Sequence, residues 1–209
     1  MGGFHFCGGT IVSSSYVLTA AHCVAETKDG IKIVAGVTDL TKLNKPHNVY
    51  EIIIHPQYEA FKIGPMWVND IALLRVAPFS YSKTVSKVTL PERGSEIHEN
   101  AIGTVSGWGR LTNGRFSKLL QRVNIMVTSQ QYCEKIYSEA AMTVYPTQYC
   151  AHNPDENSGP CTGDEGGPMT IDGVMEGIIS NIFNCGSVTY PNIHTRVADY
   201  VDWIYSHIG

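Results

Sequence analysis

The segment Tyr50-Glu51-Ile52-Ile53-Ile54 is a short run of β-branched and alternating residues, and runs of this kind recur along the chain. The others cover residues 16–19, 31–34, 71–74 and 123–127. Turn residues bound these runs at short intervals, which is the pattern of strands in an antiparallel sheet. The sequence therefore predicts an all-β protein, either a sandwich or a barrel.

Two segments have a helical pattern instead. Residues 130–137 form a short polar–apolar segment, and residues 197–208 are the stronger candidate because their apolar residues recur at helical spacing. The stretch Pro91-Glu92-Arg93-Gly94-Ser95 is typical of a linker and divides the chain into near-equal halves. We expect two domains, 1–95 and 96–209, the second ending in a helix at about 197–208.

Charge and hydropathy exclude two classes of partner. The 209 residues include nineteen acidic and fifteen basic side chains, so the formal net charge is −4. Nucleic-acid binding is disfavoured, because no overall basic excess is available to neutralise phosphates. The longest apolar runs are far shorter than the roughly 18 residues that a membrane-spanning helix needs. We expect a monomer that binds neither nucleic acid nor membrane.

Six cysteines stand at positions 7, 23, 133, 150, 161 and 185, and none of them forms a CxxC pair. An even number at long spacing indicates a disulfide framework and therefore secretion to an extracellular compartment. Fifteen pairings are possible, and six reduced core cysteines in a cytosolic protein are the alternative. No signal peptide is visible, so we expect that it was removed or that the sequence begins inside the mature protein.

A set of motifs then occurs in one order along the chain. They are Cys7-Gly8-Gly9-Thr10, residues 18–23 (LTAAHC), residues 69–74 (NDIALL), Gly107-Trp108-Gly109 and residues 163–168 (GDEGGP). This order resembles the trypsin/chymotrypsin family of serine proteases over essentially the whole chain. The resemblance implies two six-stranded antiparallel β-barrels with the active site between them, a C-terminal α-helix, and the local disulfides Cys7–Cys23, Cys133–Cys150 and Cys161–Cys185.

The same resemblance assigns the catalytic positions. In such a site a serine hydroxyl attacks the amide, a histidine takes its proton and a buried aspartate holds the histidine. By resemblance His22 is the base and Asp70 its orienting acid, whereas the nucleophile position holds Glu165. The oxyanion loop contains Gly163 and Asp164. A carboxylate has no proton for His22 to remove, and its charge opposes the oxyanion that must develop. We therefore expect a proteolytically inactive chain; the alternative is a laboratory substitution in an active enzyme.

The primary specificity pocket is also expected to be altered. The resemblance places it at Gly159, Pro160, Ser180, Asn181, Ile182 and Asn192. Gly159 at the floor means that no acidic group is present there for Arg or Lys substrates. Ile182 and Asn192 align with wall glycines, so their side chains are expected to narrow the slot. Asn181 replaces an aromatic residue, and Ser180 is expected to support Asp70. On its own, this pattern also fits a narrow specificity for small residues.

One charged contact is predicted around the nucleophile position, and a second is left open. Family members pair the aspartate at Asp164 with a newly cut N-terminal ammonium, and the Ile-Val-Gly-Gly segment that supplies it is not visible here. If that segment is missing, Asp164 loses its partner and the loop is expected to be zymogen-like; the alternative is that the segment lies upstream and the pair is intact. Glu165 is expected to form an ion pair with His22 and to raise the pKa of that imidazole. The alternative is that Glu165 turns into solvent.

The expected function follows from these departures. The chain resembles the inactivated serine protease paralogues of parasitic mites, related to the mite gut trypsins, a group associated with interference with host complement. This resemblance implies a secreted binding protein for a host protein such as a complement component, with no cofactor and no metal. The alternatives are an active hydrolase with an altered nucleophile, such as Thr162 or Ser180, or with narrow specificity, and a decoy for protease inhibitors.

Overall fold

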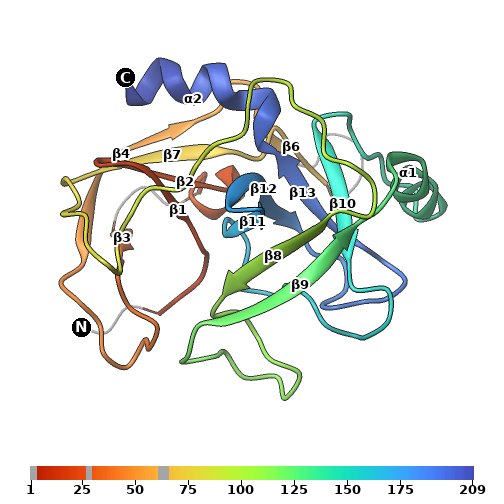
Figure 1. The fold of residues 1–209 in the computed structure, drawn as a ribbon, viewed down its shortest axis with the longest axis horizontal. Coiled ribbons are helices and arrows are strands. Elements are labelled where there is room, and N and C mark those ends of the chain that lie inside the picture. Colours follow the sequence, from red (N-terminus) through yellow and green to blue (C-terminus); the bar gives the residue numbers. More distant parts are fainter. Residues whose placement is uncertain (1–3, 27–29, 61–65) are drawn as a thin grey trace.

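The computed structural model describes residues 4–26, 30–60 and 66–209, and it is built mainly from short antiparallel strands (Figure 1). The strands of the first half are β1 (Thr10–Ser13), β2 (Tyr16–Thr19), β3 (Lys32–Ile33), β4 (His47–Ile54), β5 (Glu59–Ala60), β6 (Trp67–Val68) and β7 (Ala72–Val76). Those of the second half are β8 (Ile102–Gly107), β9 (Gln121–Val127), β10 (Gln148–His152), β11 (Pro168–Ile171), β12 (Val174–Asn181) and β13 (Asn192–Arg196).

The first half is organised around β7, which is buried at the centre of a five-stranded sheet. The order of this sheet is β1-β2-β7-β4-β3, and β5 pairs separately with β6. Because β2 and β7 are antiparallel, with Thr19 opposite Ala72, the last residue of β2 and the first residue of β7 lie at the same end of the two strands. His22 follows β2 and Asp70 precedes β7 at that end of the strands, so the strand pairing brings the two residues together.

The second half is a closed six-stranded barrel with the order β10-β13-β12-β11-β8-β9. Its interior is filled by apolar residues of alternating strand positions, among them Val105, Ile125, Met169 and Ile179. This barrel, the five-stranded sheet of the first half and the C-terminal helix confirm the expected all-β fold of the trypsin type. The first sheet has five strands in the described residues, instead of the six expected, and the expected boundary at residue 95 falls in the connection from β7 to β8.

Both expected helices are present. Helix α1 (Gln130–Glu139) begins at Ser129, whose Oγ accepts a hydrogen bond from the backbone N–H of Tyr132 at 3.1 Å. At the C-terminus the helix is shorter than predicted, because residues Val197–Tyr200 form a 3₁₀ turn before α2 (Val201–Ile208). Ile204 of α2 is fully buried in the apolar core of the first half, so the C-terminal helix joins the two halves.

The three disulfides are Cys7–Cys23, Cys133–Cys150 and Cys161–Cys185. Of the fifteen possible pairings, this is the local set that the family resemblance implies. Disulfides persist in oxidising compartments, and their presence is typical of a secreted trypsin-like protein. Within the described residues, neither helix has the length and apolarity that a membrane crossing requires.

Candidate functional site

His22 and Asp70 form a hydrogen-bonded pair next to the ends of β2 and β7. His22 lies on a single 3₁₀ turn (Ala21–Cys23) that follows β2, and its Nδ1 is 2.7 Å from Oδ2 of Asp70. The backbone N–H of His22 also donates to Oδ1 of Asp70 at 2.8 Å. Asp70 is completely buried, whereas the His22 side chain keeps 14% of its surface exposed. The pair therefore has the geometry of an oriented general base.

Two residues of the second barrel complete the environment of Asp70. Ser180 on β12 donates its hydroxyl to Oδ2 of Asp70 at 2.6 Å, and Thr195 on β13 donates to the Asp70 backbone carbonyl at 3.1 Å. A buried carboxylate is costly unless hydrogen bonds satisfy it, and Ser180 supplies one of these bonds. Ser180 therefore has the supporting position that the sequence analysis expects.

Glu165 lies on the loop between Cys161 and Pro168, next to this pair. Its Oε2 accepts a hydrogen bond of 2.6 Å from the backbone N–H of Gly163, and its own backbone N–H also stabilises the carboxylate. Burial raises the pKa of Glu165, while these N–H groups and the nearby His22 act in the opposite direction. The expected ion pair between Glu165 and His22 is not formed in the described residues, because the carboxylate points to the backbone donors of its own loop instead.

The loop itself is fixed by close backbone contacts with the first half. Gly166 has a φ of +78°, and a Cβ placed there would lie 2.3 Å from Oγ1 of Thr19. The backbone N–H of Gly8 donates to the carbonyl of Glu165 at 2.7 Å. Only glycine fits at position 166, so the loop is held in one position against β1 and β2.

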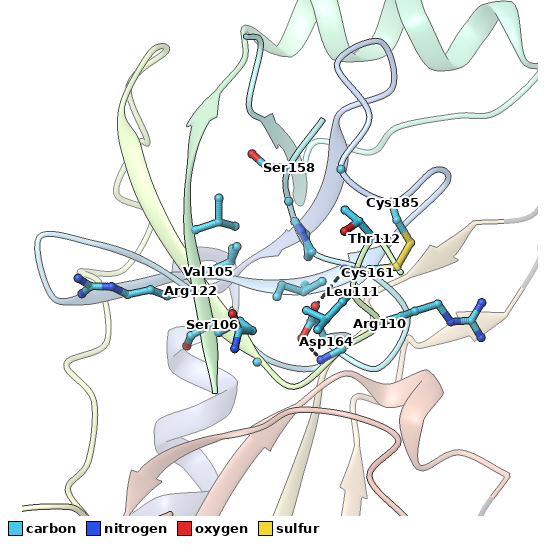
Figure 2. A pocket seen from close by; sticks show the side chains of 18 of the residues that line it. Val105, Ser106, Arg110, Leu111, Thr112, Arg122, Ser158, Cys161, Asp164 and Cys185 are labelled. Atoms are coloured by element: carbon cyan, nitrogen blue, oxygen red, sulfur yellow. Dashed lines mark hydrogen bonds between the residues drawn. A yellow bond between two sulfur atoms is a disulfide. The ribbon is translucent and has the colours of Figure 1, made fainter. Parts of the chain in front are cut away.

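Asp164 points the other way, into a cavity of about 650 Å³ (Figure 2). Its carboxylate accepts hydrogen bonds from the backbone N–H groups of Gly109 at 2.7 Å and Cys161 at 3.0 Å. Burial raises the pKa of Asp164, and these bonds and the more distant His5 counteract that effect. No ion pair to Asp164 is formed within the described residues. This cavity is where the resemblance places an N-terminal ammonium.

The residues of the expected specificity pocket lie together at one end of the barrel. The Nδ2 atom of Asn192 would be 3.3 Å from a Cβ on Gly159, so the Asn192 side chain lies beside that floor position. Asn192 is 1% exposed, and among the described residues neither atom of its amide has a hydrogen-bond partner. Ile182 packs against the apolar core of the barrel, and Pro160 is buried.

Asn181 and Trp67 connect this region with the base, and the role of Trp67 was missed from the sequence. The Trp67 ring stacks on the His22 imidazole, with centroids 4.0 Å apart and planes at 9°. The Oδ1 atom of Asn181 accepts a bond from the Trp67 backbone N–H at 3.4 Å, and its Nδ2 donates to Ser180 at 3.0 Å. The only signal in the sequence is an aromatic residue three positions before Asp70.

One group of potential metal ligands occurs in the described part of the chain, at Cys7, His22 and Cys23. The two sulfur atoms are bonded to each other in a disulfide. They are therefore not thiolates, which are the form of cysteine that binds metals. This donor set fits no metal ion.

Comparison with known proteins agrees with this geometry. The trypsin family model matches residues 1–204. A trypsin from Phaedon cochleariae is 35% identical over 206 residues, covering 96% of this chain and 78% of the relative. Chymotrypsin-2 from Vespa crabro is 36% identical over 96% of this chain and 88% of its own length. Trypsin Blo t 3 from Blomia tropicalis is 31% identical over 96% of this chain and 76% of its own length. With the His22–Asp70 pair, the closed barrel beside a five-stranded sheet, and these matches, the chain belongs to the trypsin family of serine proteases.

Proposed function

We propose that the protein is a proteolytically inactive member of the trypsin family that acts as a secreted binding protein. The observation that carries this proposal is the position of Glu165. Its carboxylate lies next to the His22–Asp70 pair, where the family resemblance places the nucleophilic serine, and accepts a 2.6 Å hydrogen bond from the Gly163 backbone N–H.

The chemistry of a carboxylate argues against peptide cleavage at this position. Attack by Glu165 on an amide would form a mixed anhydride and release an amine. The anhydride carboxylate is a far better leaving group than the amine, so the reverse reaction is faster than product formation. His22 also has no hydroxyl proton to remove from an ionised Glu165. The general-base geometry of His22 and Asp70 therefore lacks a group on which to act.

Electrostatics add a second obstacle. In serine proteases, backbone N–H groups of this loop stabilise the oxyanion that develops on the substrate carbonyl. Here the N–H group of Gly163 already donates to the Glu165 carboxylate. A substrate oxyanion would have to displace the Glu165 carboxylate from this donor. It would then develop close to the negative charge of that carboxylate. Loss of the serine alone costs about 10⁶ in turnover in subtilisin.

The pocket residues support binding through the surface rather than the cleft. Asn192 lies beside Gly159 at the expected floor, and Trp67 covers one face of the His22 ring. Surface loops on a rigid, disulfide-linked body are well suited to recognition. Following the mite paralogues, the proposed partner is a host protein such as a complement component. A serum pull-down with the purified chain that recovers no complement component contradicts this partner.

Labelling with a fluorophosphonate probe tests the inactivity. We expect no stoichiometric labelling of the natural chain and clear labelling of Glu165→Ser, because the His22–Asp70 base is in place. Stoichiometric labelling of the natural chain overturns the proposal and supports the alternative of an active hydrolase with an altered nucleophile. Thr162→Ala and Ser180→Ala then identify the labelled residue. If Glu165→Ser also fails to label, the narrowed pocket or the Asp164 region is a further obstacle.

A further inference from the structure

The connection between β8 and β9 differs in charge from the rest of the protein. Residues 101–133 contain four basic residues and no acidic residue, which gives this segment a formal charge of +4. Because the whole chain carries −4, the remaining residues carry −8. The basic residues are Arg110, Arg115, Lys118 and Arg122, and all four are exposed. The segment is thus a local basic surface on an acidic protein.

Large apolar side chains alternate with these basic ones. Four of them are exposed between residues 111 and 120, by the following fractions: Leu111 38%, Phe116 46%, Leu119 57% and Leu120 37%. Scattered single apolar residues on a surface are ordinary, whereas neighbouring exposed apolar residues are a feature of interaction sites. We call the side chains of residues 110–122 the hairpin surface.

Backbone hydrogen bonds hold this segment in a defined shape. The N–H of Gly114 donates to Leu111 at 2.8 Å and that of Leu111 to Arg115 at 2.8 Å, which closes the turn. On its other side, the Leu120 N–H donates to Thr38 at 2.7 Å. In Figure 1 the segment projects beyond the ends of β8 and β9. A preformed surface loses little conformational entropy when it binds.

No direct ion pair neutralises the basic residues of the hairpin surface within the described residues. None of its four basic side chains forms an ion pair with a described carboxylate, and the Arg110 guanidinium lies over the Phe116 ring, 5.6 Å from its centroid. An acidic residue, Asp39, forms a backbone bridge with Leu119, and hydrogen bonds from Thr41 together with the charges of Lys42 and Lys118 lower the pKa of its carboxyl. Its carboxylate accepts hydrogen bonds from Thr41 at 2.9 and 2.6 Å and lies 3.9 Å from Lys42.

We propose that the hairpin surface is a docking site for an acidic segment of a partner protein, with apolar side chains of that segment covering Phe116 and Leu119. The inference rests on the proposed binding function and specifies its surface and the chemistry of its partner. Carboxylates of the segment pair with the basic residues, so the complex forms more readily at low ionic strength.

The mixture of side chains favours a polypeptide over other polyanions. A sulfated polysaccharide pairs with the basic groups but leaves the four apolar side chains in water. An anionic membrane accepts both kinds of side chain, but it would bring Asp39, the bridge partner of Leu119, to an acidic surface. A polypeptide offers carboxylates for the arginines, apolar groups for the leucines and donors for Asp39.

The hairpin surface adjoins the Glu165 loop. The Arg110 N–H donates to the Thr162 carbonyl at 2.9 Å, and a Cβ on Gly163 would lie 2.8 Å from Cε1 of Phe116. A bound acidic segment therefore lies next to the former catalytic cleft without entering the narrowed pocket. Docking at this position needs no nucleophile.

Fluorescence anisotropy with labelled synthetic peptides tests the proposal. The probe repeats Glu-Leu-Glu-Phe, one comparison peptide replaces every Glu by Lys, and a second replaces the apolar residues by Ser. We expect saturable binding of the probe, weaker binding of the serine peptide and none of the lysine peptide. R110E/R115E/K118E/R122E should lower the probe affinity at least about tenfold. The matched control K32E/K83E/K87E/K135E makes the same charge change at exposed positions elsewhere and should bind within about twofold of the natural chain.

Leu119→Ser tests the apolar part, with Tyr205→Ser on α2, also about half exposed at 54%, as its control. Only Leu119→Ser should weaken probe binding. Three results overturn the proposal: no probe binding, equal losses in the two charge-reversed variants, or tight binding of heparin or phosphatidylserine vesicles in place of the probe. Mass spectrometry of the recovered probe keeps the two proposals separate. Cleaved probe contradicts the inactivity, whereas intact but unbound probe contradicts only the hairpin surface.

Discussion

The Oε2 atom of Glu165 lies 2.6 Å from the backbone nitrogen of Gly163, so the side chain directs its charge to the N–H donors of its own loop. This contact occupies a donor that the family uses for a substrate oxyanion. It also removes Glu165 from the ion pair with His22 that its sequence position suggests. The carboxylate is held by backbone groups, which no side-chain substitution elsewhere can remove.

Glu165→Gln should be more stable than the natural chain at neutral pH. Burial raises the pKa of Glu165, so its stabilising contribution is complete below the unfolded value near 4.5 and is lost as pH rises through the folded value. The advantage of the glutamine variant should therefore grow between pH 4 and 7. Urea unfolding at several pH values measures it, with the exposed Glu156→Gln as control. An advantage that shrinks as pH rises contradicts the burial of a charged Glu165.

His194 should make the fold sensitive to acid. It is fully buried beside Tyr149, and burial lowers its pKa from 6.5 to about 3. A lowered pKa means that the stabilising contribution is complete above pH 6.5 and is lost as pH falls toward 3, by about 1.4 kcal/mol per pH unit. His194→Phe should reduce that slope in urea unfolding, whereas exposed His98→Phe should leave it unchanged. Equal slopes in all three proteins would show that His194 is not buried as a neutral ring.

Ser180→Ala should destabilise the fold although Ser180 is not a nucleophile. The substitution removes the 2.6 Å hydrogen bond to the buried Asp70 carboxylate, and a hydrogen bond to a charged group contributes about 1.5–3 kcal/mol. Chemical denaturation measures the loss. The exposed Ser86→Ala should change stability by less than about 0.5 kcal/mol. A Ser180→Ala protein as stable as this control is incompatible with the supporting role.

Trp67→Ala should expose His22 to reagents. Trp67 covers one face of the imidazole at a centroid distance of 4.0 Å, and the His22 side chain is only 14% exposed. Acylation by diethyl pyrocarbonate, followed by peptide mass spectrometry, should be faster at His22 in this variant. Tyr205→Ala removes a surface aromatic residue from α2 and should leave the rate at His22 unchanged. An unchanged rate in Trp67→Ala would mean that the stacking does not protect the ring.

The alternating strands and the ordered motifs could be predicted because they depend on local pattern. The run at residues 16–19 is the observed β2. The LTAAHC and NDIALL motifs place His22 directly after β2 and Asp70 directly before β7, at the same end of these paired strands. The two-residue strands β5 and β6 are too short to give a periodic signal.

Tertiary contacts account for what the sequence left out. The stacking of Trp67 on His22 depends on how the segment before β7 folds over the site. The direction of the Glu165 side chain depends on backbone donors at positions 163 and 165, which compete with the more obvious charge of His22. The basic character of residues 101–133 is visible in the sequence, but its exposure beside the Glu165 loop requires the fold.

Proteolysis by the purified natural chain is the most direct measurement of the central claim. With contaminating proteases excluded by parallel purification of a His22→Ala variant, casein and a broad panel of peptide substrates should remain intact with both proteins. Turnover by the natural chain at the rate of an ordinary trypsin, absent from His22→Ala, would contradict the account, because it would require a competent nucleophile at the site that Glu165 occupies.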